Sequence, residues 1–396
     1  MTVKKITKMV LIVSFVFALV GIGGVFFDKY LVPILSGNDF FAKHHLFQDI
    51  EKNTTIINKT ETKIVREDNL IGEISSGAVS STVSVLSFSD AKAQQTRQGK
   101  AVGLLKNTKK QKTIGKRGSG VILTNDGIVV TYRNDILTKD AQYKVVVFDG
   151  SVYQATLLGV DEYTNLAFLR INGINLPAIS FANSDDVNPG KKVVLMGYSL
   201  GENHIALTEG VLTEFDPTFN LSGQAVASSE KMDGVFKVDF GGNEQYVGGP
   251  VIDFNGEMLA LTGSLEINNK EVYFQIPVNR IKEAMNRIAD GSFKKQATLG
   301  VSYLPIDIYN QELYHLPVNE GALIFSPSGE NGLAIIDGSP ADKANLRGGD
   351  IILTVNDKKI DLKHSLSFYV NHFQKGDKAT FQILRDGKKI NVVVEF

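Results

Sequence analysis

The stretch from residue 118 to residue 131 reads GSGVILTNDGIVVT. Its turn, Asn125-Asp126-Gly127, separates two runs of aliphatic and β-branched residues, a pattern that predicts a β-hairpin. Similar short runs, separated by turn residues, continue on both sides of it. They lie at residues 81–88, 144–148, 155–160, 166–171, 193–197, 204–212 and 251–261. Strands at this spacing predict a mainly β chain that forms a closed barrel or a sandwich.

Length and composition limit the possible functions. The chain has 396 residues, enough for two or three domains, and its 42 basic and 43 acidic residues nearly balance. This balance argues against a protein that mainly binds nucleic acid. Because cysteine is absent, disulfides, cysteine-ligated metals and thiol nucleophiles are excluded. No metal-ligand spacing or cofactor fingerprint occurs, so we expect neither a metal nor a cofactor.

The N-terminal segment predicts contact with a membrane. An uncharged apolar run, Met9–Phe27, follows a cluster of lysines and is about as long as a bilayer core is thick. We therefore predict a membrane anchor at residues 1–30 and a polar tether at residues 31–67. The positive-inside rule places the N-terminus in the cytoplasm and the bulk of the chain outside the cell membrane. A cleaved signal segment is the alternative.

Two units follow the tether. Asn279–Ala289 has one apolar face and predicts a helix, capped by Asn279 and ended by Gly291, that closes the strand-rich unit. The second unit begins near residue 295. In it, Ser339-Pro340 is typical of a helix start, and Leu362–Phe373 predicts a second helix. With five or six short strands, these helices predict an α+β domain of ordinary size.

Seven segments occur in a fixed order along the chain. They are GSGVILTNDG (118–127), DEYTNLAFLRI (161–171), GGPV (248–251), YFQIP (273–277), LGV (299–301), GSPADKA (338–344) and GDII (349–352). Together they resemble the HtrA/Deg family of extracytoplasmic serine proteases. The resemblance implies an N-terminal transmembrane helix, a chymotrypsin-like double β-barrel at residues 68–293 and a C-terminal PDZ domain at residues 295–396.

The same resemblance identifies the positions of the catalytic triad, and all three are substituted. Asn134 stands at the histidine position, Asn165 at the aspartate position and Val247 at the serine position. An amide is not a base near neutral pH, so Asn134 could not accept the nucleophile's proton. Asn165 has no charge to stabilise an imidazolium, and Val247 has no hydroxyl. Asp135 is acidic, but an adjacent strand residue would point to the opposite face.

Two further features bear on catalysis. Gln245 stands where the family has a glycine that shapes the oxyanion hole, so we expect an altered backbone there. His204 is the only histidine between residues 70 and 295. A replacement dyad of His204 with Ser199 is the alternative, which would make the chain an active endopeptidase that uses unconventional residues.

The resemblance also predicts a peptide-binding groove in the second domain. Its carboxylate-binding loop would be Thr298-Leu299-Gly300-Val301, whose backbone N–H groups capture a peptide's C-terminus. The helix predicted at Leu362–Phe373 would form the other wall. Its candidate liners are Leu366, Phe368, Tyr369 and Val370. In the alternative interpretation, these side chains fill the domain core.

These features predict a membrane-anchored HtrA-like pseudoprotease and not an enzyme. It would bind protein C-termini or unfolded segments in envelope protein quality control, or act as a scaffold or regulator. The predicted partners are such polypeptides, the membrane through residues 9–27, and either further copies in a homotrimer or an active relative in a hetero-oligomer. The alternatives are the active endopeptidase and a structural envelope subunit.

Overall fold

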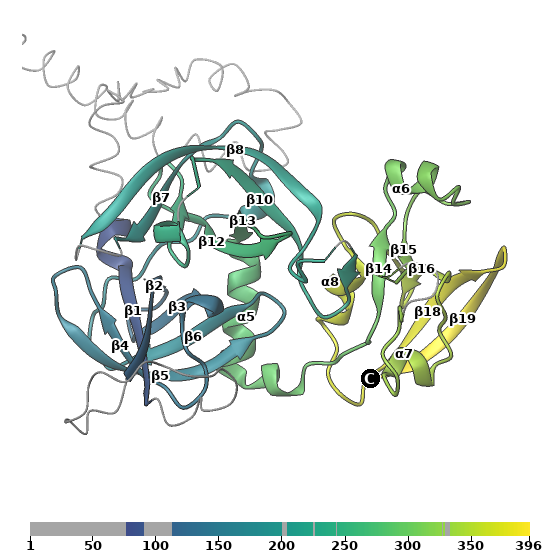
Figure 1. Ribbon diagram of the computed structural model, residues 1–396, viewed down its shortest axis with the longest axis horizontal. Helices are drawn as coiled ribbons and strands as arrows, with labels where there is room; N and C mark the ends of the chain where they lie inside the picture. The colour runs from purple at the N-terminus through teal and green to yellow at the C-terminus, as the bar shows by residue number, and fades with distance from the viewer. Residues whose placement is uncertain are drawn as a thin grey trace, which may run out of the picture. The chain divides into compact units, whose positions relative to one another are not determined.

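The computed structural model describes residues 77–90, 113–199, 204–224, 226–242, 244–326, 328 and 333–396. The first six strands form a closed antiparallel barrel in the order β1-β2-β3-β6-β5-β4 (Figure 1). They are β1 (Thr82–Asp90), β2 (Thr113–Ile122), β3 (Ile128–Tyr132), β4 (Gln142–Val146), β5 (Val152–Asp161) and β6 (Leu166–Ile171). The predicted hairpin at residues 118–131 is confirmed, because β2 pairs with β3.

Six further strands close a second barrel in the order β10-β13-β12-β11-β7-β8. They are β7 (Lys192–Tyr198), β8 (Ile205–Asn220), β10 (Asp233–Asp239), β11 (Pro250–Ile252), β12 (Met258–Ile267) and β13 (Lys270–Pro277). One apolar cluster joins the barrels, with Tyr132 and Phe168 from the first and Phe274 from the second. Each large apolar side chain buried there contributes about 1.5–3 kcal/mol, so this shared core holds the two barrels together.

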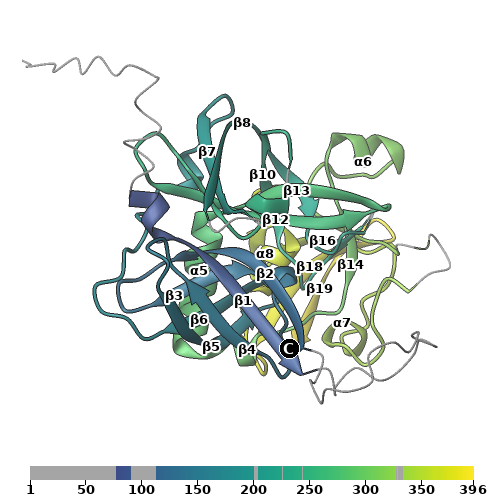
Figure 2. The ribbon, with the colours of Figure 1, turned by 60° about the vertical axis from the view of Figure 1, so that its left-hand side comes forward.

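Helix α5 (Val278–Asp290) follows the last barrel strand and contacts β5 and β6 of one barrel and β12 and β13 of the other (Figures 1 and 2). Its end is as predicted, since Gly291 adopts a left-handed conformation with φ 76°. The predicted cap is wrong: Pro277 is the N-cap residue. Instead, the Asn279 backbone N–H donates to the Ser184 hydroxyl over 3.1 Å, so a residue of the 3-10 helix η5 (Ser184–Asp186) caps the helix.

The C-terminal residues form a third sheet with the order β19-β18-β16-β15-β14-β9, and β17 pairs with β16. Strand β9 (Ala227–Ser228) comes from the connection between β8 and β10 of the second barrel, so this sheet contains a strand from outside its own domain. The others are β14 (Ser302–Pro305), β15 (Ala322–Ile324), β16 (Ile351–Val355), β17 (Lys358–Lys359), β18 (Lys378–Arg385) and β19 (Lys388–Glu395).

The helices of this domain are short. They are α6 (Ile308–Leu313), α7 (Pro340–Lys343) and α8 (Leu366–Val370). The predicted start at Ser339 is confirmed, because its hydroxyl accepts the Asp342 N–H. The helix predicted at Leu362–Phe373 is too long: α8 begins only after Ser365, whose hydroxyl accepts the Phe368 N–H.

The predicted anchor at residues 1–30 and the tether at residues 31–67 lie outside the described residues. Within the part that the structure describes, no helix is both long and apolar enough to cross a membrane.

Candidate functional site

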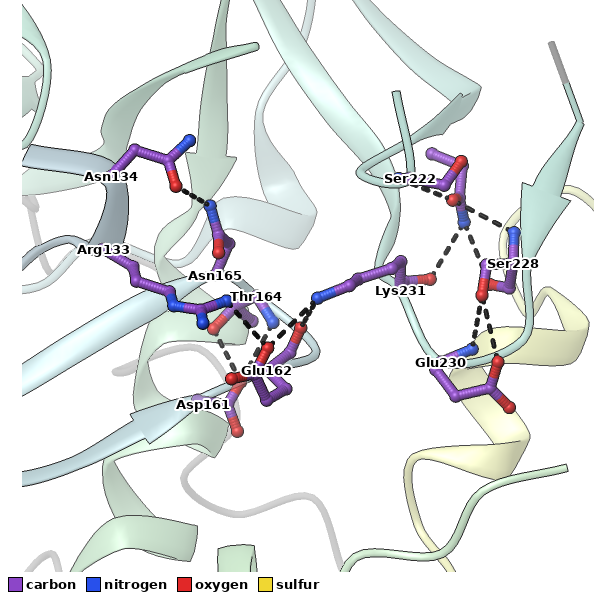
Figure 3. Close-up of polar contacts among 11 residues, drawn as sticks. Arg133, Asn134, Asp161, Glu162, Thr164, Asn165, Ser222, Ser228, Glu230 and Lys231 are labelled. Atoms are coloured by element: carbon purple, nitrogen blue, oxygen red, sulfur yellow. Dashed lines mark hydrogen bonds and ion pairs between the residues drawn. The ribbon is translucent and has the colours of Figure 1, made fainter. Parts of the chain in front are cut away.

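The structure brings Asn134 and Asn165 together. Asn134 lies in η4 (Arg133–Asp135), a 3-10 turn directly after β3, and Asn165 precedes β6 with φ 57°. The Arg133 backbone N–H donates to the Asn165 carbonyl at 3.1 Å, and the Asn165 side-chain amide donates to Asn134 Oδ1 at 3.4 Å (Figure 3). Two neutral amides therefore lie where the resemblance predicts an imidazole and a carboxylate.

A buried carboxylate fixes the turn that carries Asn165. Asp161 Oδ2 accepts the Thr164 backbone N–H at 3.0 Å and the Thr164 hydroxyl at 2.6 Å (Figure 3). Both bonds lie in a buried environment, where a charge-assisted hydrogen bond is strong. These two bonds fix the turn, although its last side chain, Asn165, carries no charge.

Val247 is only 2% exposed and belongs to the apolar cluster that joins the barrels. It follows the 3-10 turn η6 (Glu244–Tyr246), and its backbone N–H donates to the Glu244 carbonyl at 3.0 Å. In trypsin-like proteases, the N–H of the nucleophile is one of the two donors of the oxyanion hole. Here that N–H is used within the turn.

Ser119 of the first barrel holds the backbone of Gln245 in place. Its carbonyl accepts the Ser119 hydroxyl at 3.0 Å, and the same hydroxyl oxygen accepts the Tyr198 N–H at 2.8 Å. A Cβ on Gly197 would lie 2.0 Å from the Gln245 carbonyl oxygen, so only glycine fits beneath it. These contacts fix the backbone of η6 in the conformation in which the Glu244 carbonyl accepts the Val247 N–H.

Asp135 differs from its prediction. It lies in a 3-10 turn and not in a strand, and its Oδ2 atom is buried without a hydrogen-bond partner among the described residues. Burial raises the pKa of this carboxyl to about 7, against the opposing effect of Lys116. The sequence contains this acid next to Asn134, but nothing in its local pattern distinguishes a buried carboxyl from an exposed one.

Ser199 and His204 are neighbours through their backbones, since the Ser199 N–H donates to the His204 carbonyl at 2.9 Å. His204 is exposed. Their proposed role as a replacement dyad stays a prediction.

The predicted carboxylate-binding loop contacts a carboxylate of the same chain. The backbone N–H groups of Leu299 and Gly300 donate to Glu230 Oε1 at 2.9 and 2.8 Å. The Val301 N–H donates to the Ser229 hydroxyl at 3.0 Å. Gly300 has φ 79°, and a Cβ there would lie 2.4 Å from Ser339 Cβ, so glycine is required. Thr298, the first residue of the loop, is exposed.

The predicted groove liners divide into two kinds. Leu366 and Val370 are buried and pack in one cluster with Leu299 and with Ala227 of β9. Tyr369 is half-buried, and its hydroxyl donates to the Lys359 carbonyl at 2.9 Å. Leu366 and Val370 are thus core residues that also face the segment containing Ala227. Their binding of an external peptide stays a prediction.

Sequence reasoning missed the segment that occupies this loop. Ala227-Ser228-Ser229-Glu230 is three small residues and an acid within a barrel connection. A two-residue strand has no measurable periodicity, so the local sequence gives no signal of its pairing.

Comparisons with known proteins agree with this architecture. The model of the trypsin-like peptidase domain matches residues 118–261, and the model of the PDZ domain matches residues 308–396. Two solved structures share the fold. HtrA-type protease AlgW with a decapeptide is 21% identical with a TM-score of 0.61, over 84% of this chain and 98% of that one. AlgW with a tripeptide is 23% identical with a TM-score of 0.61, over 82% and 95%.

Curated relatives match the sequence directly. The probable periplasmic serine endoprotease DegP-like of Hahella chejuensis is 27% identical over 281 residues, which is 70% of this chain and 56% of the relative. Periplasmic serine endoprotease DegP of Escherichia coli is 27% identical over 284 residues, again 70% and 56%. The chain thus spans little more than half the length of these relatives.

The predicted location requires a correction. The prediction of a single-pass protein of the cell membrane is wrong, because the relatives are named as periplasmic proteases. An apolar run after lysines is common to anchors and export signals, so the sequence pattern did not separate them. The membrane contact predicted for residues 9–27 lies outside the described residues. With both domains matched in order, the chain has a trypsin-like peptidase domain followed by a PDZ domain and is similar to the HtrA/Deg family of serine proteases.

Proposed function

We propose that this chain is a pseudoprotease of the HtrA/Deg family that binds protein C-termini or unfolded segments. It would act in envelope protein quality control, or as a scaffold or regulator. The observation that carries the proposal is the amide–amide contact of Asn134 with Asn165, together with the burial of Val247. Loss of a complete triad lowers turnover about a million-fold, so three simultaneous substitutions leave no conventional route to peptide hydrolysis.

The backbone around Val247 supports the same proposal. An oxyanion hole accelerates acyl transfer only when its N–H groups point at the developing charge. The Val247 N–H is engaged by the Glu244 carbonyl, and the Ser119 hydroxyl holds the neighbouring carbonyl of Gln245. A protein with neither nucleophile nor base at these positions, and with the Val247 N–H already engaged, is suited to binding and not to cleavage.

The PDZ domain supplies the binding part of the proposal. PDZ domains bind an extended peptide as an added strand and hold its terminal carboxylate on backbone N–H groups. In this chain, the N–H groups of Leu299 and Gly300 converge on one carboxylate oxygen. The solved AlgW structures contain a decapeptide and a tripeptide, which supports peptide binding here. Assembly into a homotrimer, or with an active relative, stays a prediction that mass measurement of the purified protein would test.

Labelling with a fluorophosphonate probe tests the loss of catalysis. We expect the purified full chain to remain unlabelled and to leave casein intact under conditions in which DegP of Escherichia coli is labelled and cleaves casein. Labelling that is abolished by Ser199→Ala, or cleavage that is abolished by His204→Ala, would instead identify an active endopeptidase with an unconventional dyad. A Tyr246→Phe variant serves as a control for nonspecific phosphonylation near Val247.

A further inference from the structure

Residues 227–230 occupy the edge of the PDZ sheet in the manner of a bound peptide. Strand β9 pairs antiparallel with β14, with Ser228 opposite Ser302 and Ala227 opposite Tyr303. The ladder continues beyond the strand, because the Ser229 N–H donates to the Val301 carbonyl at 2.9 Å. This is the hydrogen-bonding pattern by which PDZ domains add a ligand strand.

Glu230 places a carboxylate at the end of this added strand. Its Oε1 atom accepts the N–H groups of Leu299 and Gly300 at 2.9 and 2.8 Å. Two further donors hold the same carboxylate in position. They are the Ser229 hydroxyl at 2.7 Å and the Ser228 hydroxyl at 3.0 Å, which Figure 3 shows. The side-chain carboxylate thus stands in for the terminal carboxylate of a peptide.

Ala227 fills the apolar part of the same groove. It is 4% exposed and packs in one cluster with Leu299, Leu366 and Val370. An external peptide could reach these side chains only after Ala227 has moved away. Backbone pairing, carboxylate capture and apolar contact are therefore all supplied from within the chain.

The segment is also anchored on its other side. The Asn220 side-chain amide donates to the carbonyls of Ser228 and Lys231, at 3.3 and 2.9 Å. Lys231 Nζ donates to the Glu162 carbonyl at 2.7 Å, in the turn that carries Asn165 (Figure 3). Lys231, the residue after Glu230, thus links the occupied groove to the turn that carries Asn165.

We propose that residues 227–230 are an internal ligand that closes the PDZ groove, and that an external partner binds by displacing them. The partner that fits is a polypeptide that ends in a free carboxylate and has uncharged residues before it. The internal segment has the same pattern, since Glu230 is its only acid and the residues before it are uncharged. The apparent affinity for such a partner is lowered by the fraction of molecules in which the groove is closed.

The inference rests on the proposed function, because it concerns the same groove. The probe for its test is a fluorescein-labelled peptide with the sequence of residues 223–230, GQAVASSE, ending in a free carboxylate. Its fluorescence anisotropy is measured with the full chain as wild type, as Glu230→Ala and as Glu209→Ala. Glu209 is an exposed acid of β8 and serves as the matched control.

We expect Glu230→Ala to bind the probe at least about tenfold more tightly than wild type, since it loses charge-assisted bonds that favour the tethered segment. Glu209→Ala should bind the probe like wild type. Hydrogen exchange at Leu299 and Gly300 provides a second readout that needs no probe. Their N–H groups should exchange at least about tenfold faster in Glu230→Ala, because their acceptor is gone.

The outcomes separate the two proposals. Equal probe affinity and equal exchange in wild type and Glu230→Ala would overturn the internal ligand and leave peptide binding standing. Faster exchange in Glu230→Ala, with no probe bound by any variant, would support the internal ligand and overturn peptide binding. Glu230→Gln, which keeps the size of the side chain, replaces Glu230→Ala if that variant does not fold and is expected to show the same changes to a smaller extent.

Discussion

The Arg287 guanidinium holds the Asp161 carboxylate in a two-point contact, with Nε 2.9 Å from Oδ1 and Nη2 3.1 Å from Oδ2. Asp161 is fully buried, whereas Arg287 keeps 15% of its side chain exposed. The pair ties helix α5 to the end of β5. Because the same carboxylate accepts two bonds from Thr164, this contact supports the turn on which Asn165 lies.

Arg287→Met should lower the free energy of unfolding by about 3–5 kcal/mol, because it leaves a buried carboxylate without its counter-charge. Urea unfolding followed by circular dichroism measures the change. Arg170→Met is the matched control. Arg170 pairs with Asp126 at the surface, where such a contact contributes about 0–1 kcal/mol. Equal effects of the two substitutions would contradict a structural role for the Arg287–Asp161 pair.

Asp135→Asn should raise stability at alkaline pH. Burial raises the pKa of Asp135 to about 7 from its ordinary value near 3.8, so the folded protein favours the protonated carboxyl. The contribution of the protonated carboxyl to the free energy of unfolding is fully present below the ordinary pKa and is lost as pH rises through about 7. Wild type should therefore lose a few kcal/mol between pH 4 and pH 8 that the asparagine variant keeps. Urea unfolding at both pH values decides the matter, and parallel pH profiles would contradict it.

Gly300→Ala should destabilise the protein more than Gly291→Ala does. Both glycines have similar positive φ values, 79° and 76°, so alanine is strained to a similar extent at each. They differ in space: a Cβ on Gly300 meets Ser339 at 2.4 Å, whereas nothing lies within 4 Å of a Cβ on Gly291. We expect about 1–2 kcal/mol for Gly291→Ala from strain alone, and about 1–3 kcal/mol more for Gly300→Ala. Thermal unfolding of both variants measures the difference.

Val247→Ser should not restore reaction with a fluorophosphonate. The new hydroxyl would have no base at the histidine position, since Asn134 cannot take a proton, and no oxyanion donor is gained. Adding Asn134→His and Asn165→Asp to Val247→Ser should give measurable but slow labelling, because the Val247 N–H position still donates to Glu244. Labelling of the single variant at the rate of an active relative would show that the site keeps a base that these residues do not reveal.

Local chemistry explains what the sequence could predict. The turn at Asn125-Asp126-Gly127, the helix end at Gly291 and the cap at Ser339 each depend on residues within a few positions, and each is confirmed. The meeting of Asn134 with Asn165 was predictable only through the motif order of the family. The fixed register of Gly248-Gly249-Pro250 likewise identified Val247.

Contacts between distant residues explain what could not be predicted. Ser184 caps α5 from a separate 3-10 turn, and Glu230 reaches Gly300 across 70 positions. Neither residue differs from an ordinary loop residue in its local sequence. Helix α8 is shorter than its apolar pattern because the Ser365 hydroxyl accepts the Phe368 N–H. A helix that continued toward Leu362 would need that N–H for a backbone hydrogen bond.

The position of β9 also has a consequence for solubility. Without it, β14 would be the last strand of its sheet, with a row of backbone N–H and C=O groups open to any other extended chain. The barrel connection pairs with that row and so prevents strands of other protein molecules from adding to the sheet. A fragment cut at residue 295 would lack this cover, and its tendency to form aggregates would reveal how much protection two residues provide.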